Sequence, residues 1–394
     1  MPTDSNRIKV LLAGLCSQLV CVGIARFAYT PLLPIMHEQT WLGDASGGWL
    51  AAVNYMGYMS GALIAASVGN LRAKDRLYRA GLVVAVLSTL GMAFTQDVIL
   101  WAVLRFVAGL SSAGAMLLAA GLILNWLLRH HLRGELGLHF AGIGSGIAFA
   151  ALAVEGLSRL GQAWDGQWLW LAVLGAVLAV PAWMWLPGPD TRPFTASGKP
   201  LQDLPPPGGF LKLLLAAYFC AGYGYVISAT FIVAIVERQP DLAGQGNFVF
   251  LIVGLVAAPA VLAWDRLARR TGVLPALILA YGVQAVGIVL PAVSPTLSAA
   301  MASAVLYGAT FVGCVSLVLT MAGRFYPTKP AKLMGTLTLA YGAAQILAPA
   351  LTGMLAEALG SYDLGLWLAG GFVAVGAVLI AALARMETPD ALRS

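Results

Sequence analysis

The stretch "TGVLPALILAYGVQAVGIVLPAVSPTLSAAMASAVLYGATFVGCVSLVLTMAG", residues 271–323, contains no charged residue. As one helix it would extend about 80 Å at 1.5 Å per residue, far more than the roughly 30 Å hydrocarbon layer of a bilayer. The segment "PAVSPT", with Pro291 and Pro295, supplies a turn near its middle. We therefore predict two membrane-spanning helices joined at this turn.

The composition of the whole chain is typical of a membrane protein with many spans. Of its 394 residues, 60% are hydrophobic and only 10% are charged, whereas a soluble globular protein carries about a quarter charged residues. Runs of the required length, about 20 apolar residues, predict twelve helices. These lie at approximately 10–36, 46–69, 80–96, 98–128, 136–158, 166–186, 209–236, 246–264, 272–292, 295–323, 333–359 and 362–384.

The lysines and arginines indicate the orientation of these helices. If the N-terminus is cytoplasmic, 19 of the 23 lie on the cytoplasmic side, two outside (Arg159 and Arg238) and two within spans (Arg26 and Arg105). This asymmetry follows the positive-inside rule. We therefore expect both termini to be cytoplasmic. The first apolar segment is too long for a signal peptide and lacks a small-residue cleavage site, so we expect no cleavable signal. The net charge of +6 then reports topology rather than nucleic-acid binding.

The four cysteines all lie in apolar segments without metal-type spacing, and we interpret them as small core residues. We expect no metal and no cofactor. Glycines four residues apart, Gly57 with Gly61 and Gly142 with Gly146, predict places where helix backbones approach closely.

One long polar interruption divides the chain into halves. "PGPDTRPFTASGKPLQDLPPPGG", residues 187–209, separates six spans from six, and its proline and charge content suits an exposed linker. The halves echo one another, because "IKVLLAGLC" (8–16) resembles "LKLLLAAYF" (211–219) and "KDRLYR" (74–79) resembles "WDRLARR" (264–270). We predict an all-α protein with a first bundle at 1–186, a linker at 187–208 and a second bundle at 209–394, with both DRL motifs in cytoplasmic loops.

At these motifs the chain resembles the major facilitator superfamily of secondary transporters. Asp75, Arg76 and Arg79 match the family's loop signature, and Asp265, Arg266, Arg269 and Arg270 form its second copy. "RFVAGLSSA" (105–113) matches the pattern of the fourth helix. More narrowly, "GIARFAYTPLLPIM" (23–36), "NYMGYMSGAL" (54–63) and "AYGAAQILAP" (340–349) resemble the YbfB/YjiJ-like branch, and "AGIGSGIAFA" (141–150) lacks the proline of the drug-antiporter motif.

The resemblance implies a fold of two six-helix bundles that transports by alternating access, in the inner membrane of a bacterium. It also implies that the first and fourth helices line a central cavity. Gating then falls to Asp75, Arg76, Arg79, Asp265 and Arg266, with Asp75 holding the cytoplasmic side shut against the start of the eleventh helix.

Two buried arginines are the main candidates for binding substrate. Arg26 lies about 25 Å along its helix from Lys9, and Arg105 about 12 Å from Asp97, so both lie between the middle and the outer half of the membrane. Charges at this depth are costly and usually face a cavity or a partner. Arginine binds carboxylate or phosphate with two parallel hydrogen bonds. The alternatives are snorkelling for Arg26 and helix packing for Arg105.

Polar and aromatic residues could complete such a site. The candidates are Gln18, Tyr29, Asn54, Tyr58, Tyr223, Tyr225, Tyr307, Thr310 and Gln345. For proton coupling we consider Glu155, His139 and Arg105. Glu155 either carries a proton in partnership with Arg105 or forms an ordinary ion pair with Arg159 at i+4. His139 either titrates or is bonded to water at a helix end, and Glu357 is interpreted as interfacial.

The sequence therefore predicts a monomeric secondary transporter for a small organic solute, anionic or amphipathic, coupled to protons or run as an exchanger. Export is favoured over import by the branch resemblance. Rival classes fit less well. The chain lacks the histidine clusters of di-iron enzymes and any ATP-binding motif, and repeated halves suit alternating access better than a channel.

The topology can be tested by a reporter that is active only outside the cytoplasm. Fused after Gly208, at the end of the linker, it should stay silent because the linker is expected to be cytoplasmic. The same reporter fused in the loop after Asp97, on the predicted outer side, should be active. Strong activity after Gly208 would contradict the span count.

Overall fold

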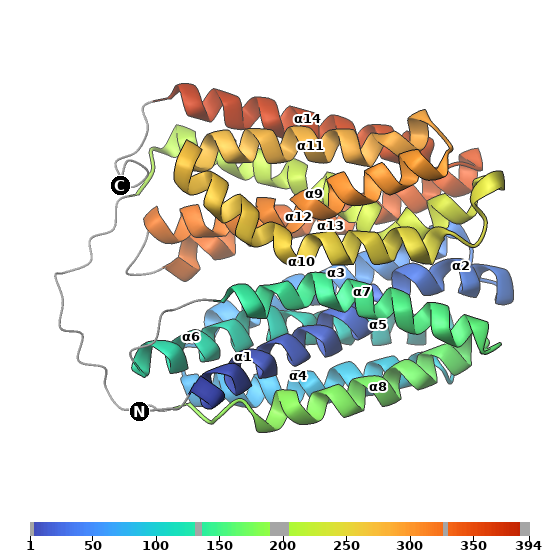
Figure 1. The fold of residues 1–394 in the computed structure, drawn as a ribbon, viewed down its shortest axis with the longest axis horizontal. Helices are drawn as coiled ribbons and strands as arrows, with labels where there is room; N and C mark the ends of the chain where they lie inside the picture. Colours follow the sequence, from blue (N-terminus) through green and yellow to red (C-terminus); the bar gives the residue numbers. More distant parts are fainter. Residues whose placement is uncertain (1–3, 131–135, 190–204, 326–329, 387–394) are drawn as a thin grey trace. The chain divides into compact units, whose positions relative to one another are not determined.

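The computed structural model describes residues 4–130, 136–189, 205–325 and 330–386, which form twelve continuous helical segments (Figure 1). The first is α1(Asp4–Gln18), π-helix η1(Leu19–Phe27) and α2(Tyr29–Gln39); then come α3(Asp44–Ser67) and α4(Leu71–Met92), and the fourth is α5(Val98–Ala113), π-helix η2(Gly114–Ala119) and α6(Ala120–Arg129). The others are α7(Gly137–Arg159), α8(Trp164–Met184), α9(Gly208–Glu237), α10(Gly246–Thr271), α11(Val273–Val293), α12(Leu297–Phe325), α13(Pro330–Leu359) and α14(Asp363–Arg385), with a short 3-10 turn η3(Pro240–Leu242) after α9. This confirms the predicted twelve-helix architecture.

Ten of these segments in the described residues are long and apolar enough to cross a membrane. The remaining two differ in composition: α4 carries five charged residues in its first turns, whereas α3 has only Asp44 but contains many glycine, serine and tyrosine residues. The predicted turns are confirmed at Asp97, whose carboxylate accepts from the amides of Ile99 and Leu100 at 2.9 Å, and between Val293 and Leu297.

The prediction that both DRL motifs lie in loops is wrong. α4 begins at Leu71, because the Asn70 side chain accepts the Arg72 amide at 2.8 Å and caps the helix. The first motif is therefore helical, and α4 begins nine residues before the predicted span, which starts at residue 80. The second motif lies in the last turns of α10, which ends where Gly272 adopts φ +94. The first copy thus follows the turn between α3 and α4, whereas the second copy precedes the turn between α10 and α11.

Residue contacts divide the chain into two units, each with its own core. The first contains residues 1–42 and 53–197, and the second contains residues 43–52 and 198–394. The boundary after α8 falls in the expected linker, most of which lies outside the described residues. The start of α3 belongs to the second unit although it comes early in the chain.

The two units repeat one packing order. In the first, α4 packs on α5 and α8, and α1 packs on α7 and α8. In the second, α11 packs on α12 and α14, and α9 packs on α13 and α14. Counted along each half, α4 corresponds to α11, α5 to α12 and α8 to α14, while α1 corresponds to α9 and α7 to α13. The similarity in sequence between the halves is therefore accompanied by equivalent packing.

The glycines predicted to bring helices together do so. A Cβ on Gly57 of α3 would collide with the Phe106 carbonyl oxygen of α5, and one on Gly109 of α5 would collide with the Asn54 carbonyl oxygen of α3. Across α7, a Cβ on Gly146 would lie 3.0 Å from the Cα of Gly23. A Cβ at Gly57 or Gly109 has no space in its crossing, and one at Gly146 would force its neighbour to shift.

The α3–α5 crossing can be tested by Gly57→Ala. The added methyl group has no space against backbone, so the free energy of unfolding should fall by about 1–3 kcal/mol. Gly121→Ala is the matched control, because a Cβ there meets nothing within 4 Å and alanine favours a helix over glycine. Thermal unfolding of the purified protein measures both, and equal melting temperatures would contradict the close packing.

Candidate functional site

The first span of the first unit contains a π-helix, and this feature determines where Arg26 lies. In η1 the Ala28 amide donates to the Gly23 carbonyl at 2.9 Å, an i+5 bond. Continued to Arg26, the i+5 pattern reaches Pro31, which has no N–H to donate. π-helical segments of this kind are frequent at functional sites.

Two side chains from the fourth segment supply donors to the carbonyls of η1. Arg105 donates through Nη1 to the Ala25 carbonyl at 3.0 Å and through Nη2 to the Arg26 carbonyl at 3.4 Å. The Ser112 hydroxyl donates to the Cys21 carbonyl at 2.7 Å. Because lipid offers no water to unpaired backbone groups, these contacts allow the irregular helix to persist at membrane depth.

Arg26 itself lies among aromatic rings. Its guanidinium carbon is 4.4 Å from the centre of the Tyr55 ring, 4.7 Å from that of Tyr58 and 5.4 Å from that of Phe27. Only 6% of the residue is exposed. Such contacts stabilise a cation by about 0.5–2 kcal/mol each. The guanidinium N–H groups lie in its own plane, so an oxyanion would approach them edge-on.

Five of the six substrate candidates that the sequence placed in the first half lie together: Arg26, Tyr29, Asn54, Tyr58 and Arg105. The sixth, Gln18, lies against His139. The Tyr29 ring lies 4.3 Å from the Arg105 guanidinium carbon, and Asn54 Nδ2 donates to the Arg105 carbonyl at 2.7 Å. Buried Asn54 Oδ1 and Arg105 Nε have no hydrogen-bond partner among the described residues. Sequence reasoning missed Tyr55, although its spacing of three from Tyr58 places both on one helix face.

In the second unit the candidates fall into two groups. The Tyr225 ring stacks with those of Tyr307 (6.5 Å), Phe311 (5.3 Å) and Tyr341 (5.8 Å), and the Tyr307 hydroxyl donates to the Tyr225 carbonyl at 3.0 Å. The predicted Gln345 follows Tyr341 by four residues on α13, and its buried Oε1 has no hydrogen-bond partner among the described residues.

Two other candidates in this unit have separate partners. Tyr223 stacks on Phe372 at 4.1 Å. The Thr310 hydroxyl donates to the carbonyls of its own helix, at Leu306 and Tyr307.

The proton-coupling candidates have contacts elsewhere. Glu155 forms the i,i+4 ion pair with Arg159 at 2.8 Å, and both side chains are exposed. His139, in the first turn of α7, is fully buried, with Nε2 3.0 Å from Gln18 Nε2. A Cβ on Gly14 would lie 2.6 Å from His139 Nδ1, so the ring fills the space between α1 and α7.

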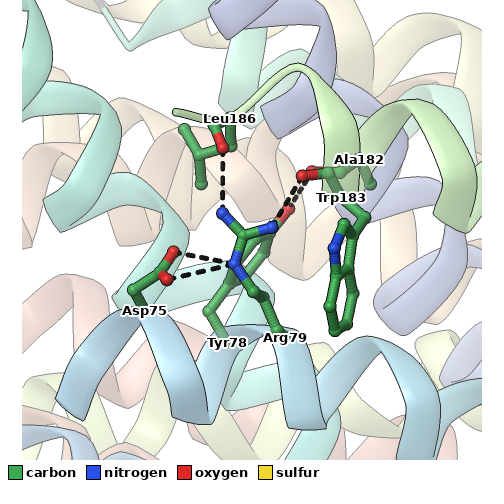
Figure 2. Close-up of polar contacts among 6 residues, drawn as sticks. All are labelled: Asp75, Tyr78, Arg79, Ala182, Trp183 and Leu186. Carbon is green, nitrogen blue, oxygen red and sulfur yellow. Dashed lines mark hydrogen bonds and ion pairs between the residues drawn. The ribbon is translucent and has the colours of Figure 1, made fainter. Parts of the chain in front are cut away.

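The first DRL motif joins α4 to the end of α8 (Figure 2). Arg79 Nε donates to both Asp75 oxygens at 3.1 and 3.0 Å, while its terminal nitrogens donate to the carbonyls of Trp183 at 2.7 Å and Leu186 at 3.0 Å. Close by, the Tyr78 hydroxyl donates to the Ala182 carbonyl at 2.9 Å. A cation at the negative end of the α8 dipole is favourable, so Arg79 caps this helix.

The second copy makes a weaker arrangement. Asp265 and Arg269 pair at 2.9 Å, but their side chains are 49% and 63% exposed, against 15% and 19% for Asp75 and Arg79. Among the described residues, Arg266 donates to the Leu262 carbonyl, at 3.5 Å. Arg76 is exposed. The gating roles of all five residues stay predictions.

Comparison with known proteins identifies the family. Residues 18–381 match the model of the family described as "Uncharacterised MFS-type transporter YbfB", so the chain belongs to this family of major facilitator superfamily transporters and is not an enzyme. No curated protein matches the chain.

Solved structures with the same fold include a mutant of the nucleoside transporter NupG, with 14% identity, a TM-score of 0.76 and coverage of 95% of this chain and 99% of that one. A bacterial homologue of the human lysosomal transporter Spinster, in an inward-facing and unoccupied conformation, has 18% identity, a TM-score of 0.71 and 97% coverage of both chains. A D-xylose–proton symporter has 16% identity, a TM-score of 0.72 and 98% coverage of both chains.

The difference between the DRL copies can be tested by the same substitution in each. Arg79→Lys keeps the charge but loses the planar fork that reaches Asp75 and two carbonyls, so the free energy of unfolding should fall by about 1–3 kcal/mol. Arg269→Lys removes only an exposed pair, which contributes about 0–1 kcal/mol. Thermal unfolding compares them, and an equal or larger loss for Arg269→Lys would contradict the capping role of Arg79.

Proposed function

We propose that this secondary transporter moves a small organic anion and that Arg26 binds the anionic group. The observation that carries this proposal is the guanidinium of Arg26, buried at membrane depth and surrounded by the rings of Phe27, Tyr55 and Tyr58. A buried charge in a spanning helix is expensive and marks a functional site by default. The tyrosines offer ring surface for apolar parts of the substrate and hydroxyls for polar parts.

The two buried arginines have different roles in this proposal. Arg105 already donates through both terminal nitrogens to the carbonyls of Ala25 and Arg26. It therefore acts as a positioning residue, which supports η1 and through it the orientation of Arg26. Substrate binding by Arg105 itself, the sequence-based prediction, would require these bonds to break.

The aromatic residues of the second unit stay substrate contacts predicted from the sequence, and their rings suit apolar groups. Tyr225 and Tyr307 present stacked rings, and Gln345 carries a buried amide oxygen that could accept from a polar substrate group. Tyr223 belongs to the same proposal through its stack with Phe372. The rings around Arg26 in the first unit favour an anion that also has an apolar part, that is, an amphipathic anion.

The mode of coupling is a finer part of the proposal. The contacts of Glu155 and His139 favour structural roles, because Glu155 pairs with Arg159 and His139 is packed against Gly14. We therefore propose exchange of anions as the mode of coupling. Proton coupling is the second candidate. Export, a bacterial inner-membrane location with cytoplasmic termini and function as a monomer stay predictions from the sequence.

Binding of small anions to the purified full-length protein tests the role of Arg26. Benzoate and its neutral analogue benzamide are the paired compounds, followed by a panel of organic acids and inorganic phosphate. An anion that raises the melting temperature should bind the Arg26→Lys protein about ten- to a hundredfold more weakly, because lysine loses the bidentate geometry. Calorimetric titration measures the affinity.

Three further results distinguish binding from stability. Tyr55→Phe should keep the ring contact and the affinity, whereas Tyr55→Leu should weaken binding. Arg105→Lys should lower the melting temperature more than Arg26→Lys does, because it loses the bonds to η1. Normal anion affinity in a destabilised Arg26→Ala protein would show that Arg26 is structural and would overturn the proposal.

A further inference from the structure

Arg105 has one charged donor that takes no part in supporting η1. Its terminal nitrogens Nη1 and Nη2 donate to the carbonyls of Ala25 and Arg26. The third nitrogen, Nε, is buried and has no hydrogen-bond partner in the part of the chain that the structure describes, and only 3% of the residue is exposed. A buried charged donor without an acceptor is costly, so a substrate group that accepts from Nε would be stabilised there.

A contact at Nε leaves the support of η1 intact. The bidentate contact that the sequence predicts needs a terminal nitrogen of Arg105, and it would break a bond to η1. A single acceptor at Nε breaks neither bond. Arg105 can therefore position η1 and bind a substrate group at the same time.

The two buried arginines place two positive charges near one another in the first unit. Arg105 Nη2 lies 3.4 Å from the Arg26 carbonyl oxygen, and the two guanidiniums interact electrostatically. The Arg26 guanidinium carbon is 4.4 Å from the centre of the Tyr55 ring. That of Arg105 is 4.3 Å from the centre of the Tyr29 ring, so the two cations occupy separate positions. Neutral rings, hydroxyls and carbonyls stabilise a guanidinium but do not cancel its charge.

The acids of the first unit have positions and contacts of their own. Asp75 pairs with Arg79, and Glu155 pairs with Arg159. The other acids that the structure describes in this unit lie in connections or in the end turns of helical segments: Asp4, Glu38, Asp97 and Asp165. A substrate with two negative charges would neutralise both buried arginines, whereas a monoanion would leave one buried positive charge uncompensated.

We propose that the substrate is a dianion with two separate acidic groups, such as a dicarboxylate. The first group binds Arg26, and the second accepts a charged hydrogen bond from Arg105 Nε while Nη1 and Nη2 keep their bonds to η1. Two separate groups are favoured over one doubly charged group because the two guanidiniums lie against different rings. The inference rests on the proposed function, since it requires Arg26 to bind an anionic group, and it adds the charge of the substrate and a second binding residue.

Three benzene dicarboxylates test the number of charges in the purified full-length protein. Phthalate, isophthalate and terephthalate hold two carboxylates at increasing separation, and both are ionised at about pH 7.5. In calorimetric titration, at least one of the three should bind about tenfold more tightly than benzoate, as expected for one additional charged hydrogen bond. The monomethyl ester of that isomer has one charge and should bind about as weakly as benzoate. Phenyl phosphate carries both charges on one group and should not show the gain.

Variants of Arg105 assign the second charge through the ratio of the Kd for benzoate to the Kd for the preferred dicarboxylate. Damage to η1 weakens both ligands and leaves this ratio unchanged. Arg105→Gln removes the charge and should bring the ratio to about one, whereas Arg105→Lys keeps the charge and should stay within about threefold of the parent. Arg159→Gln is the matched control, because it removes an arginine of the same unit whose side chain is 79% exposed, and it should leave the ratio unchanged.

Equal affinities for benzoate and all three dicarboxylates would overturn the inference and leave the role of Arg26 standing. It would also fail if the monomethyl ester or phenyl phosphate bound as tightly as the dicarboxylate, or if Arg159→Gln lowered the ratio as far as Arg105→Gln. The same holds if Arg105→Gln kept the ratio of the parent, or if Arg105→Lys lost it completely.

Two further outcomes separate this inference from the proposed function. Benzoate affinity that Arg26→Lys leaves unchanged would overturn both. Absence of binding by all of these anions would overturn the dianion, and the wider panel of acids would then decide the role of Arg26. If Arg105→Gln does not fold, the monomethyl ester in the parent and the ratio in Arg105→Lys decide between the same outcomes.

Discussion

A bilayer gives backbone amides and carbonyls no water to bond with, and this constraint governs the structure. Regular helices satisfy it without help, and the twelve segments are nearly all regular. The exceptions are the π-helices η1 and η2, and in η1 Pro31 cannot continue the i+5 pattern from Arg26. Arg105 and Ser112 donate to three of the carbonyls there. The position of Arg26 among its tyrosines thus depends on hydrogen bonds made by a different helix.

Much of this organisation follows from local sequence, and some of it does not. Apolar length predicts the twelve segments, and proline or aspartate predicts the turns at Asp97 and after Val293. The π-helix could not be predicted, because it needs donors that lie about eighty residues away along the chain. The partners of Arg79 at Trp183 and Leu186 were inaccessible for the same reason. The sequence predicts loops at the two DRL motifs because hydropathy shows where a helix leaves the membrane and does not show where the helix itself ends.

The DRL motifs show how related sequences diverge in physical role. In the first half a polar cap at Asn70 starts the helix early, so that Arg79 lies beside the end of α8. In the second half the helix continues to Gly272, and within the described part of the chain Arg269 pairs with an aspartate one turn earlier on its own helix. A shared motif therefore indicates common ancestry more securely than it indicates a common contact.

The assignment of residues 43–52 to the second unit bears on how such a chain could have arisen by gene duplication. A duplicated half-gene would encode six helices, yet the folded units here do not coincide with the encoded halves. An isolated first half would leave Gly48 without the backbone it packs against, and an isolated second half would leave Arg238 without Asp44. When the halves are fused in one polypeptide, each molecule contains one copy of every partner. Two separately translated halves would have to be synthesised in equal amounts to achieve this.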